Sequence, residues 1–265
     1  MDKRLQNYYR QKMKVTIFSK RTMILILATI GILLMENIIL GNSRMRGGQS
    51  NGWDLLLSIL KNNNYYLFFF LPYLLLYSYE ICHEQNVGRY VALRLGRRFN
   101  WLASKVLSIL TVGTLFTVLY LVLVTMGAFL LQGYGSHWGI DYEFGYQTLI
   151  IPVVAYGALS IRYLLSAWFI TSVYLLVFRH TRKNQHVKAF MVCFLILFAN
   201  RLVSVNFLMQ WLPFLSISTD YVALIREHQG LPQFLFRYNT GVMASIISMY
   251  SVLWFTNKKI ELGNE

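Results

Sequence analysis

Long apolar runs that alternate with short basic segments constrain the fold of this chain more than any other feature. A hydrocarbon core about 30 Å thick is crossed by about 20 apolar residues in a helix. We assign six spans on this basis, at residues 22–40, 65–79, 106–131, 162–178, 189–205 and 240–255. Helices satisfy their own backbone hydrogen bonds inside a membrane. The sequence therefore predicts an all-α polytopic membrane protein with one transmembrane domain, 1–265.

Composition supports a membrane protein and argues against nucleic-acid binding. Hydrophobic residues make up 56% of the chain and charged residues 14%, with a mean hydropathy of +0.45, far from the values of soluble domains. The net charge is +14, but the basic residues lie between apolar runs, where membrane topology explains them. We therefore predict membrane lipid, and no nucleic acid, as a partner. Cys82 and Cys193 are predicted to be free, packed thiols.

The distribution of lysine and arginine predicts the orientation of the spans. Segments 1–21, 80–105, 179–188 and the tail after residue 255 hold eighteen of these residues, whereas the segments on the other side hold five. Because cytoplasmic segments carry the excess of positive charge, both termini and segment 80–105 are placed in the cytoplasm. We expect a multi-pass protein of a bacterial plasma membrane.

The amino-terminal segment 1–21 combines positive charge with periodic apolar residues. Its apolar positions recur at intervals of three and four, at Leu5, Tyr8, Tyr9, Met13 and Ile17. This pattern is typical of an amphipathic helix that lies on the membrane surface. A frayed basic tail is the alternative interpretation.

Three charged residues fall inside apolar runs, where charges are costly and often functional. Glu36 lies four positions before the end of its run, so its side chain can reach the outer headgroups; a buried functional carboxylate is the alternative. Arg162 is expected at the outer boundary of the fourth span. Arg201 either lines a polar interior, or its helix ends early and the side chain extends outward.

Two segments do not fit simple spans. Residues 41–63 are expected to form a loop with a small apolar patch on the outer membrane surface. Residues 148–178 would form a helix of about 46 Å, too long for one simple span. We therefore predict a break at Pro152 and Gly157, with an outer or re-entrant piece before the fourth span. Pro72 is expected to kink the second span.

Motifs for catalysis or nucleotide binding are absent from the sequence. Reactive side chains are densest at Glu80, Cys82, His83 and Glu84, but a helical zinc motif needs a second His four positions after the first, where Val87 stands. Neither a Gly-x-Ser-x-Gly turn nor a phosphate-binding Gly-x-x-x-x-Gly-Lys loop occurs. We predict no catalytic residue, metal or cofactor in this chain. The other histidines are interpreted as surface residues: His137, His180, His186 and His228.

The polar interval 80–105 carries the pattern most informative about function. It contains Glu84-x-x-x-Gly88-Arg89-Tyr90, then Leu93-Arg94-Leu95-Gly96-Arg97-Arg98, then Trp101-x-x-Ser104-Lys105. This order resembles the cytoplasmic link between the second and third helices in permease subunits of ABC transporters of the six-helix exporter class. In that family a Glu and a Gly precede a short coupling helix, and basic residues follow it. Many relatives have Pro where Gly96 stands.

The resemblance implies a function, partners and contact residues. A permease of this class forms the translocation path of an ATP-driven exporter, pairs with a second copy or a homologous permease, and is not itself an enzyme. A separate ABC ATPase subunit would bind ATP and Mg²⁺. The coupling helix would contact that ATPase through apolar anchors inside a basic frame. The residues implied are Glu84, Gly88, Arg89, Tyr90, Leu93 and Arg94.

Other interpretations stay open beside the resemblance. Segment 80–105 could be a basic loop that only fixes topology and touches anionic lipid. The chain could then be a polytopic membrane enzyme, or a non-transporting membrane sensor or immunity protein. For a permease, the aromatic-rich spans favour an amphipathic substrate such as a peptide, an antibiotic or a lipid-like molecule.

Overall fold

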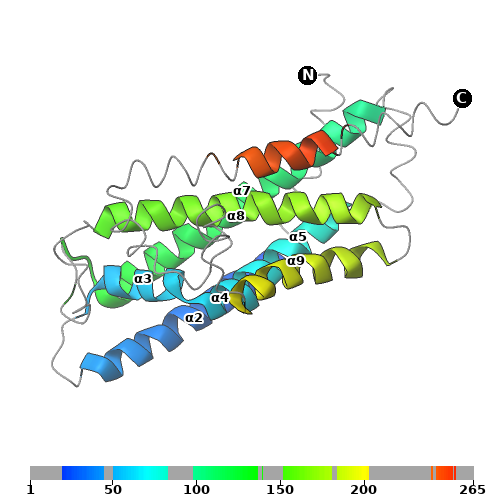
Figure 1. Cartoon of the computed structure of the whole chain (residues 1–265). Coiled ribbons are helices and arrows are strands. Elements are labelled where there is room, and N and C mark those ends of the chain that lie inside the picture. Colours follow the sequence, from blue (N-terminus) through cyan, green and yellow to red (C-terminus); the bar gives the residue numbers. More distant parts are fainter. Residues whose placement is uncertain are drawn as a thin grey trace, which may run out of the picture.

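The computed structural model is helical wherever it describes the chain. It describes residues 20–44, 50–82, 98–136, 139, 152–180, 184–202, 240, 243–252 and 254. These ranges hold helices and no strand, as expected for an all-α membrane protein (Figure 1). The predicted amphipathic helix and the predicted coupling helix lie outside the described residues and stay predictions.

Among the described helices, three are long and apolar enough to cross a membrane. Their apolar parts are Thr22–Gly41 in α2 (Lys20–Arg44), Val106–Gln132 in α7 (Arg98–Gln132) and Pro152–Phe178 in α8 (Pro152–His180). Shorter apolar helices cover Tyr66–Tyr79, Met243–Val252 and Gln185–Ile196, the last within α9 (Gln185–Leu202). These shorter helices fall in the other three predicted spans. Membrane-spanning character is thus supported for three helices, and the count of six remains a prediction.

The helices α7 and α8 form the centre of the bundle. They run antiparallel, because Trp168 Nε1 donates to Thr114 Oγ1 at 2.9 Å and Thr125 Oγ1 donates to the Tyr156 hydroxyl at 3.0 Å. The helix α2 packs on α7, and α9 packs on α8. Of the apolar window in α8, 67% is buried inside the protein, against 22% in α2. The α8 helix is therefore central and α2 peripheral (Figure 1).

The second apolar run is built from three helical pieces. They are α4 (Asn63–Tyr65), the π-helical turn η1 (Tyr66–Phe70) and α5 (Leu71–Cys82). The backbone N–H of Leu71 bonds to the carbonyl of Tyr66, which closes the wide turn directly before Pro72. Because Pro72 has no N–H to donate to the preceding turn, an irregularity is expected near it. The structure places that irregularity at η1, and isolated π-turns are frequent at functional sites.

The segment predicted as an outer loop contains a helix, α3 (Gly52–Lys61), and the prediction was wrong there. Its start is fixed by a capping box. The Asn51 side chain accepts from the backbone N–H groups of Trp53 and Asp54, and the Asp54 carboxylate accepts from the Asn51 N–H at 2.8 Å. Almost all of its residues are buried against α2, α7 and α8. The apolar patch therefore packs inside the bundle instead of lying on a membrane surface.

Two glycines allow α3 to approach the end of α7. Gly133 has a φ of 75°, and its N–H bonds to the Phe129 carbonyl at 3.0 Å, so it ends α7 as a left-handed cap. The Gly52 N–H donates to the Gly133 carbonyl at 3.0 Å. A Cβ on Gly52 would lie 2.6 Å from that oxygen and would collide with the Phe129 ring. No other residue fits at position 52 without a backbone shift.

Within the described residues, the break predicted at Gly157 in the fourth span does not occur. The α8 helix is continuous from Pro152 to His180 and passes through Gly157. Pro152 stands at the first helical position. A backbone N–H at this position has no acceptor within the helix, so the N–H that proline lacks costs no hydrogen bond. A single glycine costs about 1 kcal/mol in a helix, and packing on α7 offsets that cost. The proline therefore stands at the start of the described helix, and Gly157 does not interrupt it.

Candidate functional site in the bundle interior

The residues predicted to contact an ATPase lie outside the described part of the chain. These are Glu84, Gly88, Arg89, Tyr90, Leu93 and Arg94. The structure describes the helices on either side of them. The α5 helix ends at Cys82, and the α7 helix begins at Arg98. These two helices pack against each other and α5 also packs on α8. The predicted link therefore connects helices that share one core.

Glu36 is buried between α2 and the segment that follows α3. Its side chain is 6% exposed, and the Asn62 amide donates to its Oε1 at 3.3 Å. The Tyr65 hydroxyl lies beside the same carboxylate. One of the two sequence interpretations placed this side chain at the outer headgroups, and the other buried it. The geometry matches a buried carboxylate. Its partners, Asn62 and Tyr65, could not be identified from the spacing of residues in the sequence.

Arg162 is also buried, and it lies well inside its helix. It stands ten positions after Pro152, about 15 Å along α8, and is 5% exposed. Its positive charge interacts electrostatically with the hydroxyl groups of Tyr66 and Tyr163. The predicted position at the outer end of a span depended on a helix break that does not form. Because α8 is continuous, the guanidinium sits within the bundle beside aromatic hydroxyls.

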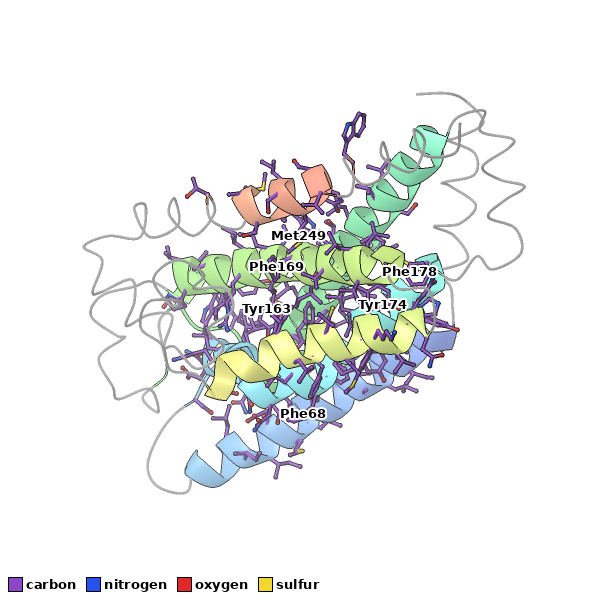
Figure 2. All side chains as sticks on the ribbon, turned by 45° about the vertical axis from the view of Figure 1, so that its right-hand side comes forward. Phe68, Tyr163, Phe169, Tyr174, Phe178 and Met249 are labelled. Carbon is purple, nitrogen blue, oxygen red and sulfur yellow. The ribbon has the colours of Figure 1, made fainter. Side chains whose placement is uncertain are left out.

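A group of aromatic rings fills the interior next to Arg162. The Phe70 ring lies 4.9 Å from Tyr163, 5.3 Å from Tyr120 and 5.5 Å from Tyr66, measured between centroids. The Tyr163 hydroxyl donates to the Leu60 carbonyl of α3 at 3.1 Å. We call Tyr66, Phe70, Tyr120 and Tyr163 the aromatic core. Figure 2 shows Tyr163 within the packed interior, whereas Phe68 of the same apolar run as Phe70 is 62% exposed.

Several hydroxyl groups in this region have no hydrogen-bond partner among the described residues. They are the hydroxyls of Tyr66 and Tyr120 and the Oγ of Ser160. The side chain of Ser166 lies near Tyr66, and that of Tyr163 lies near Tyr120, without closing a hydrogen bond. Unpaired buried polar groups are costly. Of these groups, the Tyr66 hydroxyl lies within reach of the Arg162 charge.

A second polar junction, missed by sequence reasoning, lies at the ends of α5, α8 and α9. His186 was interpreted as a surface residue, but its side chain is half-buried. Its Nδ1 and the Tyr174 hydroxyl are 2.9 Å apart. The imidazole also packs against Tyr79 at 4.2 Å and Phe178 at 4.6 Å between centroids. The available signal was the spacing of Tyr174 and Phe178, four apart on one helix face.

The remaining candidates are placed only in part. The α9 helix continues through Arg201 to Leu202, so it does not end before that residue, and the Arg201 side chain is not among those described. Cys82 and Cys193 are buried free thiols, as predicted. Within the described residues, no three His, Cys, Asp or Glu side chains could hold a metal ion together. Of the Glu80–Glu84 cluster, only the side chain of Cys82 is described.

The partners of Glu36 lead to a stability prediction. Glu36→Leu is expected to lower the free energy of unfolding by about 1–3 kcal/mol, because the Asn62 amide then loses its acceptor. Glu36→Gln keeps a carbonyl oxygen for that amide and should stay within about 0.5 kcal/mol of the parent. Reversible unfolding in mixed detergent micelles measures both variants. Equal losses in the two variants would show that the charge, and not the acceptor, stabilises this site.

Comparison with known proteins does not assign this chain to a family. No family model, curated protein or solved structure matches the chain. The functional conclusion below therefore rests on the residues of this chain and their geometry.

Proposed function

We propose that this chain is the permease subunit of an ATP-driven exporter. It forms the translocation path, pairs with a second permease and couples to a separate ABC ATPase that hydrolyses ATP. The observation that carries the proposal is the order of residues from Glu84 to Lys105 between the second and third predicted spans. In this arrangement the protein is a multi-pass component of a bacterial plasma membrane with both termini in the cytoplasm.

The packing around the ends of the link supports a coupling role. The α5 helix leads into the link and packs on both α7 and α8. Near its end, Tyr79 contacts His186 of α9, which in turn contacts Tyr174 of α8. A displacement of the link would therefore act on four helices at once. Closure of two ATPases around ATP could then shift the bundle between two conformations, which is a population shift and needs no chemistry in this chain.

Buried polar groups in the bundle support a transport role over a purely structural one. Charged residues inside a membrane are expensive and tend to mark substrate or ion pathways. Glu36 and Arg162 are both nearly inaccessible to solvent, and Arg162 adjoins the Tyr66 hydroxyl, which has no hydrogen-bond partner among the described residues. An interior of this kind suits a substrate that combines apolar and polar parts, such as a peptide, an antibiotic or a lipid-like molecule.

Co-purification tests the proposal directly. The tagged chain, extracted from its native host in a mild detergent, is expected to carry an ATPase with a phosphate-binding loop. The double variant Tyr90→Asp, Leu93→Asp should reduce the recovered ATPase by about tenfold or more, because each apolar anchor contributes about 1–2 kcal/mol. Quantitative mass spectrometry of the eluate measures the ratio of ATPase to permease.

A charge-matched control separates docking from general disruption of the link. The double variant Gln85→Asp, Asn86→Asp also adds two carboxylates, at unspecified positions between Glu84 and Gly88, and should leave the recovered ATPase unchanged. Recovery of a homogeneous chain with no ATPase at any stage would count against the permease. It would favour a membrane enzyme or a non-transporting sensor or immunity protein.

A further inference from the structure

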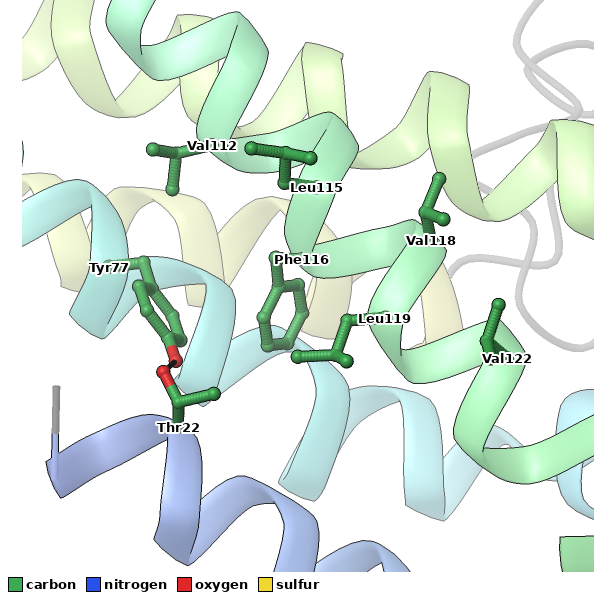
Figure 3. A pocket seen from close by; sticks show the side chains of 8 residues that line it. All are labelled: Thr22, Tyr77, Val112, Leu115, Phe116, Val118, Leu119 and Val122. Atoms are coloured by element: carbon green, nitrogen blue, oxygen red, sulfur yellow. Dashed lines mark hydrogen bonds between the residues drawn. The ribbon is translucent and has the colours of Figure 1, made fainter. Parts of the chain in front are cut away.

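An open apolar groove lies between the start of α2, the end of α5 and the middle of α7. Its volume is about 310 Å³, at the low end of the range of ligand-binding pockets, about 300–1,000 Å³. Six of its eight lining residues come from α7, and they follow one side of that helix (Figure 3). The lining residues are Thr22, Tyr77, Val112, Leu115, Phe116, Val118, Leu119 and Val122. We call this feature the α7 groove.

The α7 groove offers few hydrogen-bonding groups to a ligand. Its two polar residues are Thr22 and Tyr77, at one end, and their hydroxyl oxygens lie 2.5 Å apart in a hydrogen bond (Figure 3). The other six lining side chains are aliphatic or phenyl groups. A polar ligand would lose its hydration there without gaining a partner. The groove therefore suits a hydrocarbon chain.

The length of the α7 groove matches one leaflet of a bilayer, and its Thr22 end relates it to the first span. From Val112 to Val122 the lining extends about 15 Å along the helix, which is half of a hydrocarbon core of about 30 Å. The end marked by Thr22 is the start of the first apolar span, so the groove covers the half of the membrane nearest that end. With the orientation given by the charge distribution, this half is the cytoplasmic leaflet.

The groove opens outward from the bundle. Leu115, Val118 and Val122 on its α7 side are 41%, 48% and 45% exposed, and they belong to a helix long and apolar enough to cross a membrane. Acyl chains are the surrounding medium of such a surface. Lys20 and Arg21 directly precede Thr22 in the sequence, so the chain carries positive charge at the level where lipid headgroups begin.

We propose that the α7 groove is a binding site for one acyl chain of an anionic phospholipid in the cytoplasmic leaflet. The chain lies along α7 from Val112 to Val122, and the headgroup lies beyond the bonded pair of Thr22 and Tyr77. The site requires only the membrane-spanning bundle and its orientation, and it needs no ATPase. Its occupant is a lipid that stays with the protein and modulates packing between α2, α5 and α7, rather than a transported substrate.

Photocrosslinking of the full chain in lipid vesicles tests this site. The vesicles contain phosphatidylcholine and a trace of phosphatidylglycerol with a diazirine midway along one acyl chain. After irradiation, mass spectrometry locates the adducts. Adducts on residues 112–122 are expected to exceed those on the more exposed Met126 and Leu130 by about fivefold, the factor that corresponds to about 1 kcal/mol of preference.

Variants that fill the groove distinguish a site from general lipid contact. Leu119→Trp occupies the floor and Val118→Trp occupies the rim, and each should lower adduct formation at residues 112–122 by about fivefold. Leu130→Trp, at a position that is 82% exposed on the same helix and outside the groove, is the matched control and should change nothing. Size-exclusion profiles identify variants that fold, and the rim variant keeps the test decisive if the floor variant does not.

Two outcomes would overturn the proposal. Adducts spread along α7 in proportion to exposure, and unaffected by the tryptophans, would mean that only bulk lipid touches this face. Adducts missing from residues 112–122 while Met126 and Leu130 on the same helix are labelled would mean that protein covers the groove. Neither outcome bears on ATPase co-purification, so this site and the proposed function can fail separately.

Discussion

Replacing Phe70 with alanine is expected to lower the free energy of unfolding by about 3–5 kcal/mol, the usual effect of emptying a buried phenylalanine site. The side chain is fully buried, and it is the ring around which the aromatic core packs. It also contacts Phe116 of α7 at 5.1 Å between centroids. Loss of this ring would leave a cavity between η1, α7 and α8. Reversible unfolding in mixed micelles, followed by circular dichroism, measures the change.

Phe68 provides a matched control for Phe70 within the same π-turn. It has the same side chain two residues earlier but is 62% exposed. Phe68→Ala is therefore expected to change stability by about 0.5 kcal/mol or less. Similar losses in the two variants would contradict the placement of the aromatic core and would indicate that the turn presents a different face to the bundle.

The second large effect is expected at Trp53, where Trp53→Ala should lower the free energy of unfolding by about 3–5 kcal/mol. The side chain is 6% exposed and meets Phe129 edge to face at 4.9 Å between centroids. Its Nε1 donates to the Gly135 carbonyl at 2.8 Å. The residue therefore holds α3 against the end of α7, and the same unfolding assay measures its loss.

One further variant separates the hydrogen bond of Trp53 from its packing, and a second variant is a control at an exposed tryptophan. Trp53→Phe keeps most of the packing and removes one hydrogen bond, so about 1 kcal/mol is expected. Trp254→Ala removes a tryptophan that is 49% exposed and should have a small effect, about 0.5 kcal/mol. If Trp53→Ala were no worse than Trp254→Ala, α3 would not be docked on α7 as described.

Much of the helical structure could be predicted from hydrophobic runs, but the structure of shorter segments could not. The apolar runs at 106–131 and 148–178 are longer than the about 20 residues that cross a membrane, so their identity as helices follows from length alone. The α3 helix is only ten residues long, a length at which an isolated helix is marginal. Its stability depends on contacts with α2, α7 and α8. Such contacts cannot be predicted from the local sequence.

The break predicted in the fourth span shows a different limit of sequence reasoning. Proline and glycine are read as breakers because of their local preferences, but Pro152 is tolerated at a helix start and Gly157 is tolerated within a packed helix. The error was to infer a boundary from residue type and excess length. The same error affected the prediction for Arg162, because its expected position at a helix end depended on that boundary.

Of the candidate site, the sequence could identify the charged residues but not their neighbours. Glu36 and Arg162 stand out because charges are rare inside apolar runs. Tyr66, Tyr120 and Tyr163 do not stand out, since tyrosine is common throughout this chain, with 18 copies. Three separate helical elements bring these hydroxyls together. Only the packing of η1, α7 and α8 reveals them as one group.

The π-turn η1 sets the rotational phase of everything that follows it in α5. A π-turn accommodates one residue more than the α-turn it replaces, and each residue of an α-helix advances the side-chain direction by about 100°. If the same residues formed a regular α-helical turn instead, the side chains after them would be rotated by about 100°, which would turn Leu74, Leu75 and Ser78, all now buried, away from the core. The spacing within this short turn thus determines which face of α5 meets α7 and α8, and in which direction the chain leaves Cys82.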